Sequence, residues 1–142
     1  MTEKQIGLVK RTWKIFREID PDLVGDTFYS KLFNDNPSLR RMFPKNMEQQ
    51  YRKLIDMLSA IVARLERLHE LSNDIAALAQ RHSGYGVRPA HYRLVGKALL
   101  WTLKQGLGND WTKDVEEAWT LCYNILSEAM INATARQEKK AS

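Results

Sequence analysis

The sequence lacks the features that hold small secreted proteins together or that fix a chain in a membrane. A single cysteine, Cys122, cannot form a disulfide within the chain, and its position among apolar residues at helical spacing predicts a buried, unreactive thiol. The strictly apolar run at residues 98–101 is too short to cross a bilayer, and the polar first residues do not resemble a signal peptide. We therefore expect a cytoplasmic protein without a membrane span.

A strong excess of charge of one sign is also absent. The sequence has 22 Lys and Arg residues against 17 Asp and Glu residues, a net charge of +5. We interpret this excess as scattered over mixed-charge faces, for example where Arg64 and Arg67 lie beside Glu66 and Glu70. No nucleic-acid-binding motif accompanies the basic residues, so no nucleic acid partner is expected.

Apolar residues recur at helical spacing in every long segment, and no sustained alternation predicts a strand, so the fold should be all-α. Thr2 is a candidate N-cap of a first helix that ends before Pro21, and Pro21 begins a second helix. Asn36-Pro37 predicts a cap followed by a short helical piece over residues 37–42. Further helices are expected at about residues 54–65, 72–80, 91–107 and from 112 onward.

The composition fits one globular domain. Of 142 residues, 44% are hydrophobic and 27% are charged, which leaves enough apolar side chains for a packed core. We predict a single domain over residues 1–142, in which residues 136–142 form a frayed tail. The unequal helix lengths do not suit an up-down four-helix bundle and favour an irregular orthogonal packing.

Several short motifs in this helical pattern resemble the globin family, in particular single-domain bacterial haemoglobins, neuroglobin-like globins and flavohaemoglobin-type globins. The matching stretches are Phe28-Tyr29, residues 37–43, residues 50–54, Arg81-His82 with Gly86-Val87, and Val95-Gly96 with Leu99-Leu100. The resemblance covers about residues 5–131. It implies a globin fold, a 3-over-3 helical sandwich around a haem pocket.

The resemblance implies haem b held by one proximal histidine, at the position of His82. Taken from the residues alone, His69 beside a glutamate suits the surface, and His91 near a helix start suits capping or surface packing. His82 lies one turn after Leu78, whose carbonyl could accept a hydrogen bond from the imidazole and fix its tautomer. Two alternative iron ligands are Met47 and Met57, although methionine is more often a core or surface residue.

Flavohaemoglobin-type globins also place a tyrosine and a glutamate near the proximal histidine. Tyr92 matches the tyrosine, whereas the position of the glutamate falls on Thr134. This departure argues against a peroxidase-like activation of the iron.

On the opposite, distal side, Tyr29 and Gln50 match the family's hydrogen-bond donors to bound oxygen, and Gln50 precedes His82 by 32 residues, as in the family. Hydrogen bonds to a charged acceptor contribute roughly 1.5–3 kcal/mol each, so two of them predict slow oxygen release and high affinity. Glutamine is a poor iron ligand, which predicts five-coordinate ferrous iron. Alternatively, Tyr29 is a core tyrosine bonded to the backbone, and Gln50 is a surface amide near a helix start.

The resemblance assigns the remaining pocket positions by side-chain type. Phe43 matches the aromatic residue that stacks on the haem, and Leu54 and Val87 would complete the apolar walls. Lys53 and Arg81 could pair with the haem propionates at the pocket mouth. Such residues also occur in ordinary cores and on ordinary surfaces.

The function that this resemblance implies is reversible binding and transport of oxygen, with carbon monoxide and nitric oxide as further ligands. A first alternative is a nitric oxide dioxygenase that uses an external reductase, since no flavin or nicotinamide domain is expected in this chain. A second alternative is a haem-based sensor or a helical interaction module. Trp101 and Trp111 are either buried or dimer contacts, so the oligomeric state stays open.

Overall fold

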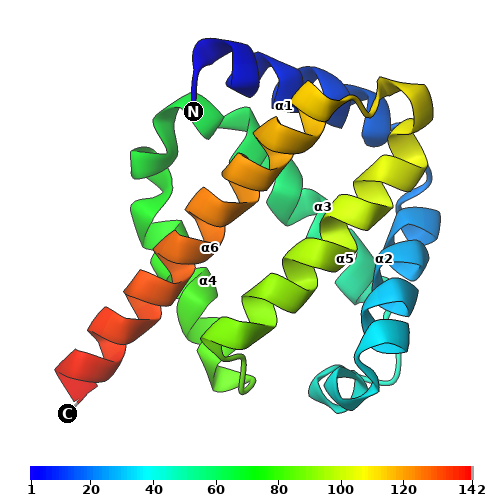
Figure 1. The fold of residues 1–142 in the computed structure, drawn as a ribbon. Helices are drawn as coiled ribbons and strands as arrows, with labels where there is room; N and C mark the ends of the chain where they lie inside the picture. The colour runs from blue at the N-terminus through cyan, green and yellow to red at the C-terminus, as the bar shows by residue number, and fades with distance from the viewer. Residues whose placement is uncertain (142) are drawn as a thin grey trace.

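A computed structural model describes residues 1–141, with the side chains of residues 1–139, and it consists of helices joined by short connections (Figure 1). The elements in chain order are α1 (Glu3–Phe16), α2 (Pro21–Asp35), the 3-10 segment η1 (Pro37–Met42), α3 (Glu48–Ala63), η2 (Leu65–Leu71), α4 (Ser72–Gly84), α5 (Pro89–Leu107), η3 (Gly108–Asp110) and α6 (Lys113–Ala141). No strand occurs among these described residues. The prediction of an all-α fold is confirmed.

The starts of α1, α2 and α5 follow from local capping chemistry. The Thr2 hydroxyl accepts a hydrogen bond from the backbone N–H of Gln5, and the Gln5 side chain accepts one from the N–H of Thr2. Asp20 caps α2, whose first residue is Pro21. At the start of α5, His91 Nδ1 accepts a hydrogen bond of 2.9 Å from the backbone of Arg88, which confirms a capping role for this histidine.

Asn36 differs from its prediction. Its side-chain amide donates to the carbonyl of Leu32, so it closes the end of α2, and it forms no side-chain cap on η1. The segment that follows has 3-10 geometry.

The C-terminal segment also differs from the sequence-based expectation. We expected residues 136–142 to fray, but α6 continues to Ala141, and Ser142 lies outside the described residues. Two non-local contacts account for the extra helix: Ala133 is buried, and the Gln137 amide donates to the carbonyl of Ala76 in α4 at 3.1 Å.

The long helices cross one another in two layers, with α1 along one edge in Figure 1 and the C-terminal half of α6 beside α4. α6 packs against α1, α4 and α5, while α2 packs against α3, α5 and η1. α3 and α4 are not an extensively packed pair in the described part of the chain, although only η2 separates them in sequence. Two residues of the candidate site, Gln50 and His82, lie on these two helices.

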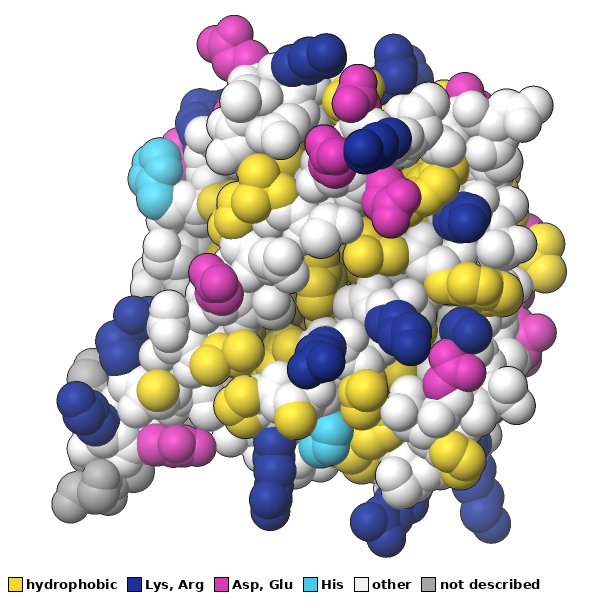
Figure 2. All heavy atoms as spheres, viewed as in Figure 1, with side chains coloured by type: hydrophobic (Ala, Val, Ile, Leu, Met, Phe, Trp, Pro, Cys, Tyr) yellow, Lys and Arg dark blue, Asp and Glu magenta, His cyan; other side chains and the backbone are white. Residues whose placement is uncertain are grey.

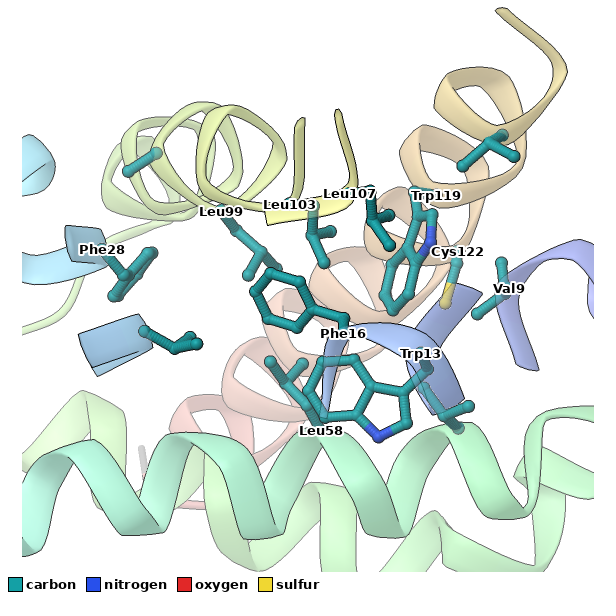
Figure 3. Close-up of a cluster of buried hydrophobic side chains, with 14 of the residues drawn as sticks. Val9, Trp13, Phe16, Phe28, Leu58, Leu99, Leu103, Leu107, Trp119 and Cys122 are labelled. Atoms are coloured by element: carbon teal, nitrogen blue, oxygen red, sulfur yellow. The ribbon is translucent and has the colours of Figure 1, made fainter. Parts of the chain in front are cut away.

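The core is closed by aromatic and branched side chains from α1, α3, α5 and α6 (Figure 3). Its indole N–H groups are hydrogen bonded: Trp119 donates to the Thr12 hydroxyl at 2.9 Å, and Trp13 donates to the Ser59 hydroxyl at 3.1 Å. Cys122 lies beside Trp119 in Figure 3, and burial raises the pKa of its thiol to about 11. The prediction of a buried thiol is confirmed, and the raised pKa disfavours the reactive thiolate.

The two tryptophans left open by the sequence have different environments. Trp111 is partly buried and packs against the core. Trp101 is 37% exposed, and the ammonium group of Lys31 lies 5.1 Å from its ring centroid. Trp101 is therefore a surface residue. None of the described helices combines the length and hydrophobicity needed to cross a bilayer.

Candidate functional site

Tyr29 and Gln50 meet where α2 crosses α3. The amide Nε2 of Gln50 donates a hydrogen bond of 3.3 Å to the Tyr29 hydroxyl oxygen. Because the amide is the donor, this bond leaves the phenolic proton of Tyr29 free to donate to another acceptor. Of the alternatives open from the sequence, a purely backbone-bonded Tyr29 and an exposed Gln50 do not occur: Tyr29 is buried and Gln50 is half-buried.

Burial keeps the Tyr29 hydroxyl protonated. Desolvation raises its pKa to about 12, against the lowering effect of the Gln50 hydrogen bond. Tyr29 is therefore a hydrogen-bond donor throughout the physiological pH range.

An aromatic cluster fixes the Tyr29 ring. It stacks on Tyr51 at a centroid distance of 5.7 Å and meets the edge of Phe43 at 5.5 Å. Phe33 packs against both Tyr29 and Phe43, at 5.8 and 5.2 Å. These contacts hold the Tyr29 ring from several sides.

Gly25 makes the crossing of α2 and α3 possible. A Cβ atom at Gly25 would lie 2.3 Å from Cγ and 2.4 Å from Cβ of Tyr51, so only glycine fits. Sequence analysis did not single out Gly25 or Tyr51 as functional. The available signal was a glycine inside a helical pattern. Glycine weakens a helix, so a glycine at such a position indicates close packing against a neighbouring element.

His82 lies in the last turn of α4 and is half-buried. Its Nδ1 is 2.8 Å from the carbonyl oxygen of Leu78, the acceptor expected from the sequence. If Nδ1 carries the proton, Nε2 is left with its lone pair free, as a metal ligand requires. The imidazole ring also stacks against Tyr92, with centroids 6.5 Å apart and an interplanar angle of 25°.

Tyr92 is positioned by α6. The Tyr123 hydroxyl donates to the backbone carbonyl of Tyr92, and burial raises the pKa of Tyr123 strongly, so this donor stays protonated. The Tyr123 ring lies against Gly96, where an added Cβ would be 2.5 Å from Cε2. This contact could not be predicted from the sequence, because Gly96 and Tyr123 are far apart in the chain. The Thr134 hydroxyl donates to the Met130 carbonyl within α6.

The other predicted pocket residues divide by exposure. Phe43, Leu54 and Val87 are half-buried, and the first two pack against the core. Lys53 and Arg81 are exposed and form no ion pair with any described side chain. Of the two candidate methionines, Met47 is buried and Met57 is half-buried, and both belong to the apolar packing. His69 is exposed, as predicted.

The structure therefore gathers the predicted residues into two groups, Tyr29 with Gln50 and Phe43, and His82 with Tyr92. No hydrogen bond or ring contact between described residues joins the two groups directly. The donor chemistry fits haem: His82 Nε2 would bind the iron, and half-buried apolar side chains are available to cover the group.

Comparison with known sequences gives the family. Residues 26–130 match the Globin family. A flavohemoprotein of Vibrio cholerae is 30% identical over 135 residues, which cover 93% of this chain and 34% of that protein. A globin-like protein of Aquifex aeolicus, described as uncharacterized, is 29% identical over 92% of both chains. The chain thus spans about one third of the length of the flavohemoproteins that it matches.

Solved structures have the same fold. A bacterial globin from Campylobacter jejuni superposes with a TM-score of 0.86 at 23% identity, covering 97% of this chain and 99% of that chain. An engineered carbene transferase, made from a candidate nitric oxide dioxygenase of Rhodothermus marinus, superposes with a TM-score of 0.87 at 25% identity, covering 99% and 98%. The family match over most of the sequence, together with these structural similarities, shows that the chain belongs to the globin family of haem-binding proteins.

Proposed function

We propose that this globin reversibly binds oxygen, and also carbon monoxide and nitric oxide, at a five-coordinate haem b held by His82. Bound haem supplies an iron with an open position for a diatomic ligand. The observation that best supports the proposal is the hydrogen bond from Gln50 to Tyr29, because it leaves the Tyr29 proton available to a ligand.

His82 holds the iron through Nε2 in this proposal. The Leu78 carbonyl fixes the tautomer and limits rotation of the ring, and Tyr92 supports one face of the imidazole. Both contacts come from the protein itself, so they would orient the imidazole toward the iron.

Tyr29 and Gln50 act as hydrogen-bond donors to the ligand. Each bond to an acceptor with negative charge contributes roughly 1.5–3 kcal/mol, so the two bonds together slow oxygen release by about a hundred- to ten-thousandfold. A glutamine amide coordinates iron poorly, so the pair leaves the ligand position open.

The other predicted pocket residues would exclude water from the haem and orient it. Phe43, Leu54 and Val87 form the apolar cover, which limits access of water to the iron. Lys53 and Arg81 are exposed and form no ion pair with a described side chain, so they are available to the two propionates.

Visible absorption spectra of the protein as isolated, after dithionite and after carbon monoxide test the proposal. We expect an intense Soret band, a five-coordinate ferrous form and a carbon monoxide complex. His82→Ala should lose or alter all three, whereas His69→Ala, which changes an exposed histidine, should leave them unchanged.

Gln50→His tests the distal assignment separately. A histidine at this position should bind the iron and produce a six-coordinate ferrous spectrum. An unchanged five-coordinate spectrum would show that residue 50 does not face the iron. A protein that stays colourless after haem addition would refute the proposal altogether.

Nitric oxide dioxygenation is the second candidate function, favoured by the flavohemoprotein relatives and by the Rhodothermus protein. In this reaction nitric oxide and oxygen form nitrate while the iron loses one electron, so each turnover needs one electron from a separate reductase. Repeated nitric oxide consumption in the presence of a reductase and NADH would favour the enzyme. A single turnover under the same conditions would favour oxygen binding.

A further inference from the structure

We infer that this globin docks an acidic protein electron donor on a basic face around the candidate haem site. The basic face consists of the exposed Lys and Arg side chains of residues 36–55 and 75–109. The inference rests on the proposed function, because a donor is needed only if the chain holds a redox-active iron.

The two segments contain a concentrated positive charge. Together they hold ten of the 22 Lys and Arg residues but only one of the 17 acidic residues, Glu48. The rest of the chain has 12 basic and 16 acidic residues, so its net charge is negative. In residues 36–55 the basic residues are Arg40, Arg41, Lys45, Arg52 and Lys53. In residues 75–109 they are Arg81, Arg88, Arg93, Lys97 and Lys104.

These charges are not neutralised within the protein. Nine of the ten side chains are exposed, and Arg40 is half-buried, with its guanidinium group donating to three backbone carbonyls. In the described part of the chain none of the ten forms an ion pair. Two haem propionates would offset part of this charge and leave the face positive.

The fold brings η1 and the beginning of α5 to one side of the molecule, whereas the end of α5, which follows Lys104, lies against the end of α1. η1 and α5 both pack against α2, and in Figure 1 the cyan η1 region and the connection from α4 to α5 lie at the same lower edge. Figure 2 shows Lys and Arg side chains over α5 and projecting from that edge. The connection follows His82 directly, so this edge is a short path from a docked donor to an iron at His82.

An exposed aromatic residue indicates a protein partner. Tyr85 is 67% exposed and lies between Arg81 and Arg88 in sequence. Its backbone N–H donates to the carbonyls of Arg81 and His82, which fix the backbone of this residue at the end of α4. Tyrosine is enriched in the centres of protein interfaces, and positive charge around it would attract an acidic partner and speed association.

The test follows reduction of the haem-loaded ferric protein by reduced flavodoxin, an acidic FMN protein, with stopped-flow absorbance. Lys45→Glu/Arg88→Glu reverses two exposed charges in the two segments. Arg11→Glu/Lys14→Glu makes the same change in net charge on α1, at the opposite edge in Figure 1, and is the matched control.

We expect the second-order rate constant at low salt to fall about tenfold in Lys45→Glu/Arg88→Glu and less than about twofold in the control. The wild-type rate should fall as salt is added, whereas the rate of Lys45→Glu/Arg88→Glu should change little. Tyr85→Ala should lower the rate at every salt concentration without changing the salt dependence. Reduction by dithionite and the carbon monoxide spectrum should be the same in all variants.

Equal rates in all variants, or equal losses in the two charge-reversal variants, would overturn the inference while the normal spectra leave the proposed function intact. A protein without a Soret band would refute both. The inference would also be wrong if the wild type bound a short DNA duplex or phosphatidylglycerol vesicles at physiological salt, Lys45→Glu/Arg88→Glu lost that binding, and flavodoxin reduction were unaffected.

Discussion

Gly25→Ala is the substitution whose effect the structure predicts most directly. The new Cβ would lie 2.3 Å from Cγ and 2.4 Å from Cβ of Tyr51, where ordinary contacts begin at 3.4 Å. Rotation of the Tyr51 ring cannot relieve the contact, because Cβ of Tyr51 is fixed to the backbone of α3. The two helices must therefore separate by about 1 Å.

Overpacking of this kind costs up to about 3 kcal/mol, and replacing glycine by alanine in a helix returns about 1 kcal/mol. The net loss is about 2 kcal/mol, or roughly 6 °C in Tm for a chain of this size. Thermal and urea denaturation followed by circular dichroism measure it. Gly7→Ala is the matched control: it is exposed in α1, its Cβ would meet nothing within 4 Å, and it should raise the stability.

A second substitution separates the steric argument from a general effect at residue 25. Tyr51→Ala keeps the clashing Cβ and should not rescue Gly25→Ala, whereas Tyr51→Gly removes it and should reduce the cost of Gly25→Ala. The Tm of Gly25→Ala at or above that of the wild type would refute the reasoning.

Three further outcomes are expected. Thr12→Val removes the acceptor of the buried Trp119 indole N–H and should lower the free energy of unfolding, measured by urea titration, by about 1–3 kcal/mol. Thr120→Val is the control and should have a smaller effect, because the hydroxyl of Thr120 donates only within its own helix. Burial raises the pKa of Cys122 from 9.0 to about 11, so the buried thiol stabilises the fold fully below pH 9, and this stabilisation is lost as the pH rises to 11. Urea titrations at several pH values should therefore show a loss of stability at alkaline pH, of which about 2–3 kcal/mol comes from Cys122. Cys122→Ala should lack this contribution. Tyr123→Phe removes the donor to the Tyr92 carbonyl and should change the iron–histidine stretching frequency of the ferrous protein. Tyr85→Phe, at an exposed tyrosine, should leave this frequency unchanged. An unchanged frequency in Tyr123→Phe would show that the position of Tyr92 does not depend on this hydrogen bond.

Features that depend on neighbours in sequence were predictable. The capping of α1 by Thr2, the start of α2 at Pro21 and the bond from His82 to Leu78 each involve residues at most four positions apart. The family resemblance then supplied the pairing of Tyr29 with Gln50, which are 21 positions apart and which helical periodicity alone could not bring together.

Features that depend on tertiary contacts were missed. The tail of α6 was expected to fray because the sequence does not show that Gln137 bonds to Ala76, 61 positions earlier. The basic residues were interpreted as scattered because they are separated along the chain. Those of η1 and of the beginning of α5 come to one edge only after both elements have packed against α2.

Both sides of the candidate site depend on a glycine that lets a tyrosine of another helix approach. On the distal side, Gly25 admits Tyr51, which stacks on Tyr29. On the proximal side, Gly96 admits Tyr123, whose hydroxyl holds the carbonyl of Tyr92 beside His82. The two contacts belong to different helix pairs, so the position of the ligand donors and the orientation of the imidazole can change independently. If His82 holds the iron as proposed, a substitution at the crossing of α2 and α3 should alter ligand stabilisation without altering this histidine. A substitution at the crossing of α5 and α6 should do the converse.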